Sequence, residues 1–282
     1  MSFRTYHQVE GSDRSRLGEQ VAAQRARVAT RLARVERVVV VLSGKGGVGK
    51  SYVTAALAIA LARQSLAIGV VDADLQSPTI GRVLDARSEG PLIVHDDGVA
   101  PAVGRDGVRV ISTDLLLDEG RALRWRSDAG EEHVWRGATE TAVLREFLAD
   151  VRWGALDALL VDMPPDASRL ADLATLVPGI AGAIAVTIPT GESERSVARA
   201  LDAARETGVP LLGIIENMSG YACRGCSAIG PLFQGDAGDR LAAAHRIPLL
   251  ARLPFTHAPL GDVAAALGGV VEVVMRTRRT VQ

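Results

Sequence analysis

The stretch VVVVLSGKGGVGKSYV, residues 38–53, joins an apolar run to a glycine-rich loop and then to helix-forming sequence. A continuous β-branched run that ends in such a loop is typical of a strand buried on both faces of a parallel sheet. Residues 44–51 fit the pattern G-x-x-x-x-G-K-[ST], and a helix is predicted directly after them, over residues 50–63. This context predicts a phosphate-binding loop.

Glycines in such a loop let the backbone wrap closely around phosphate oxygens, and the backbone N–H groups present partial positive charge to them. We expect Lys50 to reach the β and γ phosphates and the Ser51 hydroxyl to ligate Mg²⁺. The predicted nucleotide-binding residues are Gly44, Lys45, Gly46, Gly47, Val48, Gly49, Lys50, Ser51 and Tyr52.

Two further apolar runs end in aspartate. LAIGVVDAD delivers Asp72 and Asp74, and LDALLVDMPP delivers Asp162. Asp162 is in the position of the carboxylate that holds the magnesium shell in phosphate-loop enzymes, and we place Asp72 in the same magnesium environment. Asp74 is the candidate catalytic residue that orients a water molecule for attack on the γ phosphate, beside Lys45 and Lys50. A solvated acid at the end of a strand is the alternative for each of the three aspartates.

The remaining chain alternates strand and helix. The runs GAIAVTIP and LLGIIENMS flank a helical stretch over residues 193–207, as in a doubly wound α/β domain with a mostly parallel sheet. Residues 87–107 are rich in Gly, Pro and Asp, which favours a surface excursion or a short hairpin.

The N-terminal part carries a different pattern. Over residues 14–37, apolar side chains recur at helical spacing among seven arginines, which predicts an amphipathic helix. We expect this helix to dock its apolar stripe on the domain, although its arginines could instead meet an acidic partner. The predicted organisation is a helical segment over residues 1–36 and a nucleotide-binding domain over residues 37–282.

Composition limits the class of protein. The net charge of −1 over 282 residues argues against a broad nucleic-acid surface. The sequence has no apolar run of transmembrane length and no secretory signal. We expect a cytoplasmic protein with no nucleic-acid partner and no stable membrane association.

Lys45 is a second lysine in the loop, and the segment KGGVGKS resembles the deviant Walker A motif of the family that includes MinD, ParA, nitrogenase iron protein and arsenite-pump ATPases. That resemblance implies a P-loop ATPase fold in which two subunits enclose two nucleotides. Lys45 would then reach the phosphates of a partner, and the protein would form a homodimer when ATP binds. A solvated loop lysine is the simpler alternative.

A narrower resemblance covers most of the chain. The stretches DADLQSPTIGRVL, VWRGATETAVLREFLADVRWGALDALLVDMPP and GIIENMSGYACRGC are similar, in this order, to those of the Mrp and Nbp-type (ApbC-like) ATP-binding iron-sulfur cluster carriers. The resemblance implies slow Mg²⁺-dependent ATP hydrolysis and transfer of an iron-sulfur cluster to apoproteins. It also implies that Asn217 hydrogen-bonds the adenine edge.

The two cysteines of the chain, Cys223 and Cys226, form one C-x-x-C. A cluster with thiolate ligands needs four sulfur atoms, and a twofold dimer would supply them. The pair would then hold a shared [4Fe–4S] cluster, in agreement with the resemblance. A shared zinc ion, a redox pair and two inert loop thiols remain alternatives.

Two positions depart from the pattern of these relatives. Tyr52 stands where a threonine is usual, and Asp166 stands where a glycine meets the γ phosphate. Both departures put ATP turnover in doubt and leave an ATP-binding scaffold without turnover as an alternative. A positioning switch of the MinD or ParA kind, without a cluster, is the alternative from another functional class.

Overall fold

The computed structural model describes residues 17–86, 93–115, 132–165 and 168–278. Within them, nine strands form a central sheet in the order β10-β9-β8-β1-β7-β2-β6-β5, with β11 paired to β9. The strands are β1 (Val38–Ser43), β2 (Ile68–Asp72), β5 (Ala102–Val103), β6 (Arg109–Ile111), β7 (Ala158–Asp162), β8 (Gly182–Thr187), β9 (Leu211–Ala222), β10 (Ile229–Gly230) and β11 (Leu249–Phe255). Among the described strands of this central sheet, only the pairs β5–β6 and β10–β9 are antiparallel, which confirms the predicted mostly parallel α/β sheet.

Strand β1 lies in the middle of the sheet, between β7 and β8. All its residues are buried, and alternate side chains enter different cores. Val39 and Val41 belong to one hydrophobic core, whereas Val38 and Val40 belong to the other. Because successive side chains of a strand point to opposite faces, a strand covered on both faces must be apolar throughout.

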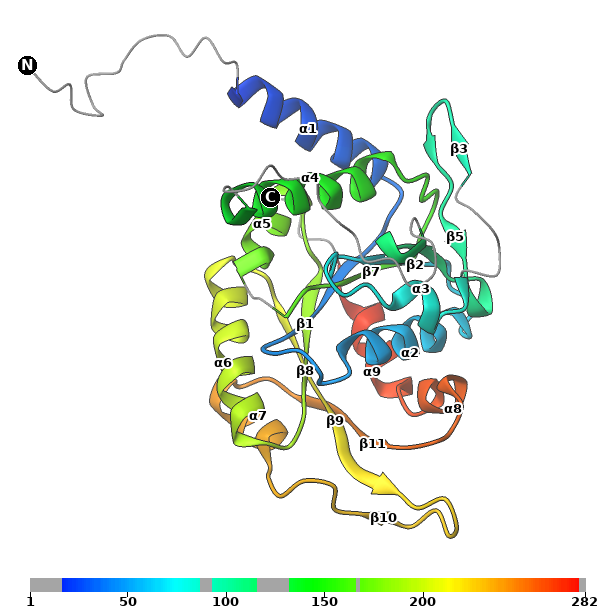
Figure 1. Ribbon diagram of the computed structural model, residues 1–282, viewed down its shortest axis with the longest axis vertical. Coiled ribbons are helices and arrows are strands. Elements are labelled where there is room, and N and C mark those ends of the chain that lie inside the picture. The colour runs from blue at the N-terminus through cyan, green and yellow to red at the C-terminus, as the bar shows by residue number, and fades with distance from the viewer. Residues whose placement is uncertain (1–16, 87–92, 116–131, 166–167, 279–282) are drawn as a thin grey trace, which may run out of the picture.

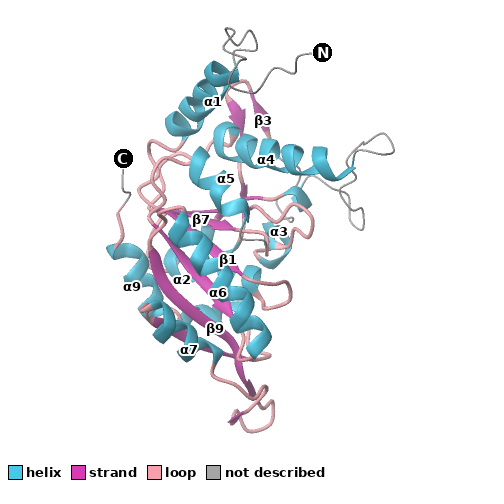
Figure 2. Cartoon of the chain, turned by 90° about the vertical axis from the view of Figure 1, so that its left-hand side faces the viewer, coloured by secondary structure: helices cyan, strands magenta, loops and turns pink. Residues whose placement is uncertain are grey.

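Helices cover both faces of the sheet (Figures 1 and 2). Helices α2, α3, α8 and α9 contribute to the core on one face, and α1, α4, α5, α6 and α7 contribute to the core on the other. Their bounds are α1 (Leu17–Arg31), α2 (Lys50–Ala62), α3 (Ile80–Val83), α4 (Glu132–Asp150), α5 (Ser168–Leu176), α6 (Gly191–Glu206), α7 (Ala237–His245), α8 (Leu260–Ala265) and α9 (Gly268–Arg276). No helix of the described chain is both long enough and apolar enough to cross a membrane.

The two terminal helices both dock on the domain. Helix α1 ends at Arg31, earlier than the predicted residue 37, and it packs against α4 through an apolar stripe that includes the buried Val28. Arg31 donates from Nε to the carbonyl oxygen of Ala149 at 2.9 Å, so one of its arginines serves this contact. Helix α9 buries Val270 and Val274 in the opposite core, as expected of a terminal helix packed on the domain.

The segment predicted as an excursion contains short strands. Strands β3 (Val94–His95) and β4 (Gly98–Val99) form an antiparallel hairpin, which confirms the hairpin, and β5 then joins the edge of the sheet. Two 3₁₀ turns, η3 (Arg105–Gly107) and η4 (Thr113–Leu115), flank β6. Residues 87–92 of the predicted excursion lie outside the described residues.

Candidate nucleotide and thiol sites

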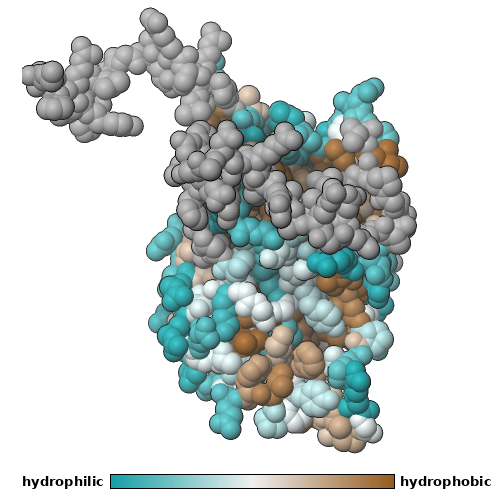
Figure 3. All heavy atoms as spheres, in the orientation of Figure 1, coloured by the Kyte–Doolittle hydropathy of each residue, from teal (hydrophilic) through white to brown (hydrophobic). Residues whose placement is uncertain are grey.

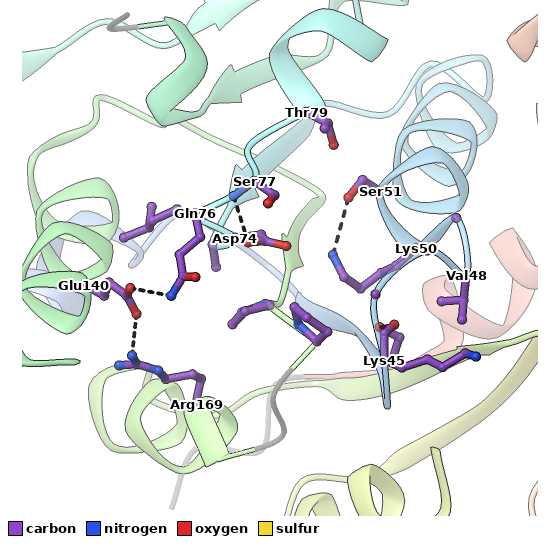
Figure 4. A pocket seen from close by; sticks show the side chains of 18 of the residues that line it. Lys45, Val48, Lys50, Ser51, Asp74, Gln76, Ser77, Thr79, Glu140 and Arg169 are labelled. Carbon is purple, nitrogen blue, oxygen red and sulfur yellow. Dashed lines mark hydrogen bonds and ion pairs between the residues drawn. The ribbon is translucent and has the colours of Figure 1, made fainter. Parts of the chain in front are cut away.

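The glycine-rich loop lines a cleft of about 640 Å³ at the carboxyl ends of β1, β2 and β7 (Figure 4). Gly47 and Gly49 have φ of 78° and 79°, a left-handed backbone that favours glycine. Gly44 is required for a different reason, since a Cβ there would lie 2.0 Å from the backbone carbonyl carbon of Ser196. The loop therefore takes its shape from a left-handed backbone at two glycines and from close packing on α6 at a third.

Asp162 is the centre of the polar contacts beneath the loop. Its side chain is fully buried, and Oδ2 accepts from Lys50 Nζ at 2.6 Å and from Ser51 Oγ at 2.6 Å. The other oxygen, Oδ1, accepts from Thr54 Oγ1 at 2.6 Å. The structure thus brings together three predicted residues and adds Thr54, which the sequence analysis missed. The available signal was a threonine one turn after Lys50, at the start of the apolar part of α2.

The residues at this point fit a magnesium ion. A serine hydroxyl and a carboxylate converge here, and oxygen donors of this kind are those that Mg²⁺ takes beside nucleotide phosphates. Ser51 and Asp162 would hold the ion, which would neutralise charge on the β and γ phosphates. In this structure Lys50 balances the buried carboxylate, so the phosphates of an incoming nucleotide would compete with Asp162 for that lysine.

Asp72 lies beside Asp162, but its carboxylate is bound by the segment that follows β2 and by Ser112 after β6. It accepts from the N–H groups of Thr79 and Ile80 at 2.9 and 3.1 Å and from the Ser112 hydroxyl at 2.8 Å. Burial first, and then the negative charge of Asp162, raise the pKa of Asp72 to about 7, while these hydrogen bonds act in the opposite direction. Asp72 therefore supports the segment that follows β2.

Asp74 is among the side chains that line the cleft (Figure 4). Its carboxylate accepts from the backbone N–H of Ser77 at 3.2 Å. Burial raises the pKa of Asp74, and the nearby charge of Lys50 opposes that rise. A half-buried carboxylate on the wall of a phosphate cleft is suited to orienting a water molecule.

Lys45 lies at the rim of the cleft and forms an ion pair within its own chain. Its Nζ atom is 3.1 Å from Glu192 Oε2, in the first turn of α6. The Glu192 side chain is 72% exposed, so the pair is screened by solvent and contributes less than about 1 kcal/mol. Such a weak pair is readily exchanged for another anion.

Two of the remaining residues of interest, Asn217 and Tyr52, lie beside the phosphate loop. Asn217 is buried under the loop, where its Nδ2 donates to the carbonyl oxygen of Val48 at 2.9 Å. Tyr52 lines the cleft, and burial raises the pKa of its hydroxyl. Asp166 lies outside the described residues.

Three polar side chains stand on the wall opposite the loop (Figure 4). Gln76 follows β2, Glu140 belongs to α4, and Arg169 belongs to α5. Gln76 Nε2 donates to Glu140 Oε1 at 2.9 Å, and Arg169 Nη2 donates to Glu140 Oε2. The sequence analysis missed this group, because none of the three has a local pattern that indicates a shared site.

Cys223 and Cys226 lie in the turn between β9 and β10, and Cys223 directly follows the last residue of β9. Both are free thiols, Cys223 partly buried and Cys226 exposed. The turn is held by hydrogen bonds from Cys223 N to Ala228 O at 3.0 Å and from Ser227 N to Cys223 O at 2.9 Å. Backbone N–H groups of Gly225 and Cys226 point at the Cys223 sulfur and lower its pKa.

The thiol turn is joined to the end of β11. Tyr221 and Phe255 stack with ring centroids 6.5 Å apart, and His257 packs edge-on against both rings. Arg224 Nη2, between the cysteines in sequence, is 2.7 Å from His257 Nδ1. The cysteine pair therefore lies at the surface, next to a cluster of three packed rings.

Comparison with known proteins identifies the family. The family model described as ParA, the NUBPL iron-transfer P-loop NTPases, matches residues 34–268. An iron-sulfur cluster carrier protein from Saccharolobus solfataricus is 36% identical, with 86% of this chain and 79% of that protein covered. The cytosolic Fe-S cluster assembly factor CFD1 from Yarrowia lipolytica is 39% identical, with coverage of 87% and 83%.

Solved structures agree with this assignment. A nucleotide-binding protein from Archaeoglobus fulgidus in complex with ADP superimposes with a TM-score of 0.68 at 30% identity, covering 88% of this chain and 93% of that one. The cell division ATPase MinD from Pyrococcus furiosus, at 20% identity and a TM-score of 0.52 over 84% and 98% of the two chains, shares the fold. From its phosphate loop, its sheet and these relatives, the chain belongs to the NUBPL iron-transfer family of P-loop NTPases.

Proposed function

We propose that this protein is an iron-sulfur cluster carrier that binds Mg-ATP and delivers a cluster to apoproteins. The observation that carries the proposal is the pair of free thiols, Cys223 and Cys226, on the turn between β9 and β10 of a chain whose relatives are named iron-sulfur cluster carriers. A cluster on such a turn is reachable by a recipient, and exposure favours its release. The cluster is cargo here.

One chain offers too few ligands for the cargo. Within the described residues, no group of three or more His, Cys, Asp and Glu side chains could hold a metal ion. Two copies related by a twofold axis would bring four thiolates together, enough for a bridging [4Fe–4S] cluster. A homodimer with one shared cluster is therefore the proposed working form.

Apolar surface near the thiol turn supports a contact between copies. Ile229 of β10 is 66% exposed and Phe255 at the end of β11 is 44% exposed, and Leu232 and Phe233 are exposed as well. Figure 3 shows apolar surface toward the end of the molecule where β9 and β10 lie in Figure 1. Burying such side chains in a dimer removes them from water, which is favourable.

ATP would promote the same dimer through Lys45. Its weak pair with Glu192 can be exchanged for the phosphates of a partner's nucleotide, which carry more charge. Asn217 is the proposed contact for the adenine edge. Slow hydrolysis is part of the proposal, since Tyr52 and Asp166 replace residues that usually meet the phosphates. The relatives named cytosolic assembly factors support a cytoplasmic place of action.

Anaerobic reconstitution with iron and sulfide tests the cargo. We expect a broad visible absorption in the wild-type protein, and we expect the iron and sulfide of one cluster to be bound per dimer. The Cys223→Ser, Cys226→Ser variant is expected to lose both and to retain nucleotide binding, which serves as the control for folding. An unchanged spectrum in the double variant, or bound zinc in place of iron and sulfide, would remove the carrier function.

A MinD-like or ParA-like positioning switch predicts a different outcome. It would need a free membrane-binding tail, whereas α9 packs on the core through Val270 and Val274. Flotation with anionic liposomes, with and without ATP, separates the two functions. ATP-dependent flotation of a protein without a cluster would favour the switch.

A further inference from the structure

The wall of the cleft opposite the phosphate loop carries a buried acid that the nucleotide chemistry described above does not use. Glu140 is 11% exposed and Arg169 is 23% exposed at the side-chain level, so both are largely removed from water. Glu140 accepts from Gln76 on one oxygen and from Arg169 on the other. Arg169 also donates from Nη1 to Thr141 Oγ1 at 3.3 Å, which fixes the plane of its guanidinium.

The three side chains tie together the two segments that close this end of the cleft. Gln76 belongs to the segment after β2, and Arg169 lies in the first turn of α5, the helix that follows β7 and the prolines Pro164 and Pro165. Glu140 comes from a third element, helix α4. A carboxylate bridging two loops in this way makes the position of one depend on the position of the other.

The order of the strands indicates which phosphate would meet this wall. Strand β1, which precedes the phosphate loop, has β8 and β9 on one side and β7 and β2 on the other. Asn217 of β9, the proposed contact for the base, lies on the first side, whereas Gln76 and Arg169 lie on the second. A nucleotide in the loop would therefore direct its terminal phosphate toward Glu140 and Arg169.

The charges of Glu140 and Arg169 affect how well the cleft accepts a terminal phosphate. An ionised carboxylate in a poorly solvated wall repels a terminal phosphate, and the repulsion is stronger than it would be in water. The guanidinium of Arg169 pairs with Glu140 and lies 3.8 Å, from Nη1, from Oδ2 of Asp172, so it offsets part of the negative charge of this wall. It also has donors of the geometry that phosphate oxygens accept. Without Arg169, the wall would disfavour a triphosphate and be nearly indifferent to a diphosphate, which ends one phosphate short of it.

We propose that Glu140 and Arg169 act as a pair that sets the preference of the cleft for nucleoside triphosphate over diphosphate. Glu140 supplies negative charge to this wall, and Arg169 is the residue that offsets this charge and makes the wall compatible with a terminal phosphate. The inference rests on nucleotide binding as given under the proposed function, and it is independent of the cysteine pair.

Calorimetric titration with ADP and with a non-hydrolysable ATP analogue, both with Mg²⁺, tests the pair. Arg169→Gln leaves Glu140 uncompensated, so we expect the Kd for the analogue to rise roughly tenfold and the Kd for ADP to change less than about threefold. Adding Glu140→Gln removes the orphaned charge and is expected to recover most of the loss. Glu140→Gln alone should bind the analogue no more weakly than the wild-type protein.

Two variants on α4 serve as matched controls. Glu146 is exposed, and Arg145 donates to Gln24 outside the cleft, so Glu146→Gln and Arg145→Gln change the same charges away from the nucleotide. Both should leave the ratio of the two Kd values unchanged. The inference would be overturned if Arg169→Gln weakened the binding of ADP and of the analogue equally, or if the double variant bound the analogue no better than Arg169→Gln. Either result would leave the proposed function standing. A wild-type protein that binds neither nucleotide would overturn the proposed function with it.

Discussion

Lys50 is expected to stabilise the nucleotide-free protein as well as to bind phosphate. Its ammonium is 2.6 Å from the carboxylate of Asp162, with side chains 6% and 0% exposed. Replacing Lys50 with methionine keeps most of the apolar volume and removes only the charge. Asp162 would then be a buried anion with two hydroxyl donors, Ser51 and Thr54, and no cation in contact.

The expected cost follows from burial. Removing one partner of a buried ion pair destabilises a protein by about 3–5 kcal/mol, because the remaining charge loses its compensation. The two hydroxyl donors stay, and a hydrogen bond to a charged group contributes about 1.5–3 kcal/mol, so we expect the lower end, about 3 kcal/mol. Asp162→Asn in the same chain neutralises the orphaned charge and should recover at least half of that loss.

Urea unfolding without nucleotide and with a chelator measures this effect. Tryptophan fluorescence is a suitable probe because Trp153 is fully buried. Lys45→Met is the matched control, and it should cost less than about 1 kcal/mol because its partner Glu192 is exposed. The reasoning would be refuted if the free energy of unfolding of Lys50→Met were within about 1 kcal/mol of the wild-type value. It would also be refuted if the Lys50→Met, Asp162→Asn protein were no more stable than Lys50→Met.

Two further predictions concern the loop and the thiol turn. Gly44→Ala should destabilise the protein and abolish nucleotide binding, since its Cβ would meet the backbone of α6 at 2.0 Å; Gly46→Ala, with nothing within 4 Å, should fold like wild type in thermal melts. Because backbone N–H groups lower the pKa of Cys223, its thiolate is populated at lower pH than an ordinary thiol, and alkylation should label Cys223 before Cys226 as pH is raised from 6 to 8. The first expectation would be contradicted if both glycine variants lost nucleotide binding equally. The second would be contradicted if mass spectrometry showed that Cys226 is labelled before Cys223.

Local sequence was sufficient for the elements that depend on short-range spacing. The predicted helix over residues 50–63 is α2 (Lys50–Ala62), and the strands expected at residues 182–189 and 211–219 are β8 and β9, the latter extending to Ala222. Buried parallel strands must be continuously apolar, and the phosphate loop must combine glycines with lysine at set intervals. The N-terminal helix was predicted six residues too long, because apolar Val35 continues its pattern after the helix has ended at Arg31.

The sequence by itself therefore determined the phosphate loop, the aspartate at the end of β7 and the cysteine pair, because each is encoded by neighbouring residues of one strand, loop or turn. The order of these local patterns along the chain determined the P-loop fold. Only the tertiary structure decided the partners of these groups. Lys50 and Asp162 are 112 positions apart, and Gln76 and Glu140 are 64 apart. Such contacts depend on the order of the strands and on the packing of α4, and no local periodicity encodes which distant side chain will face a given carboxylate.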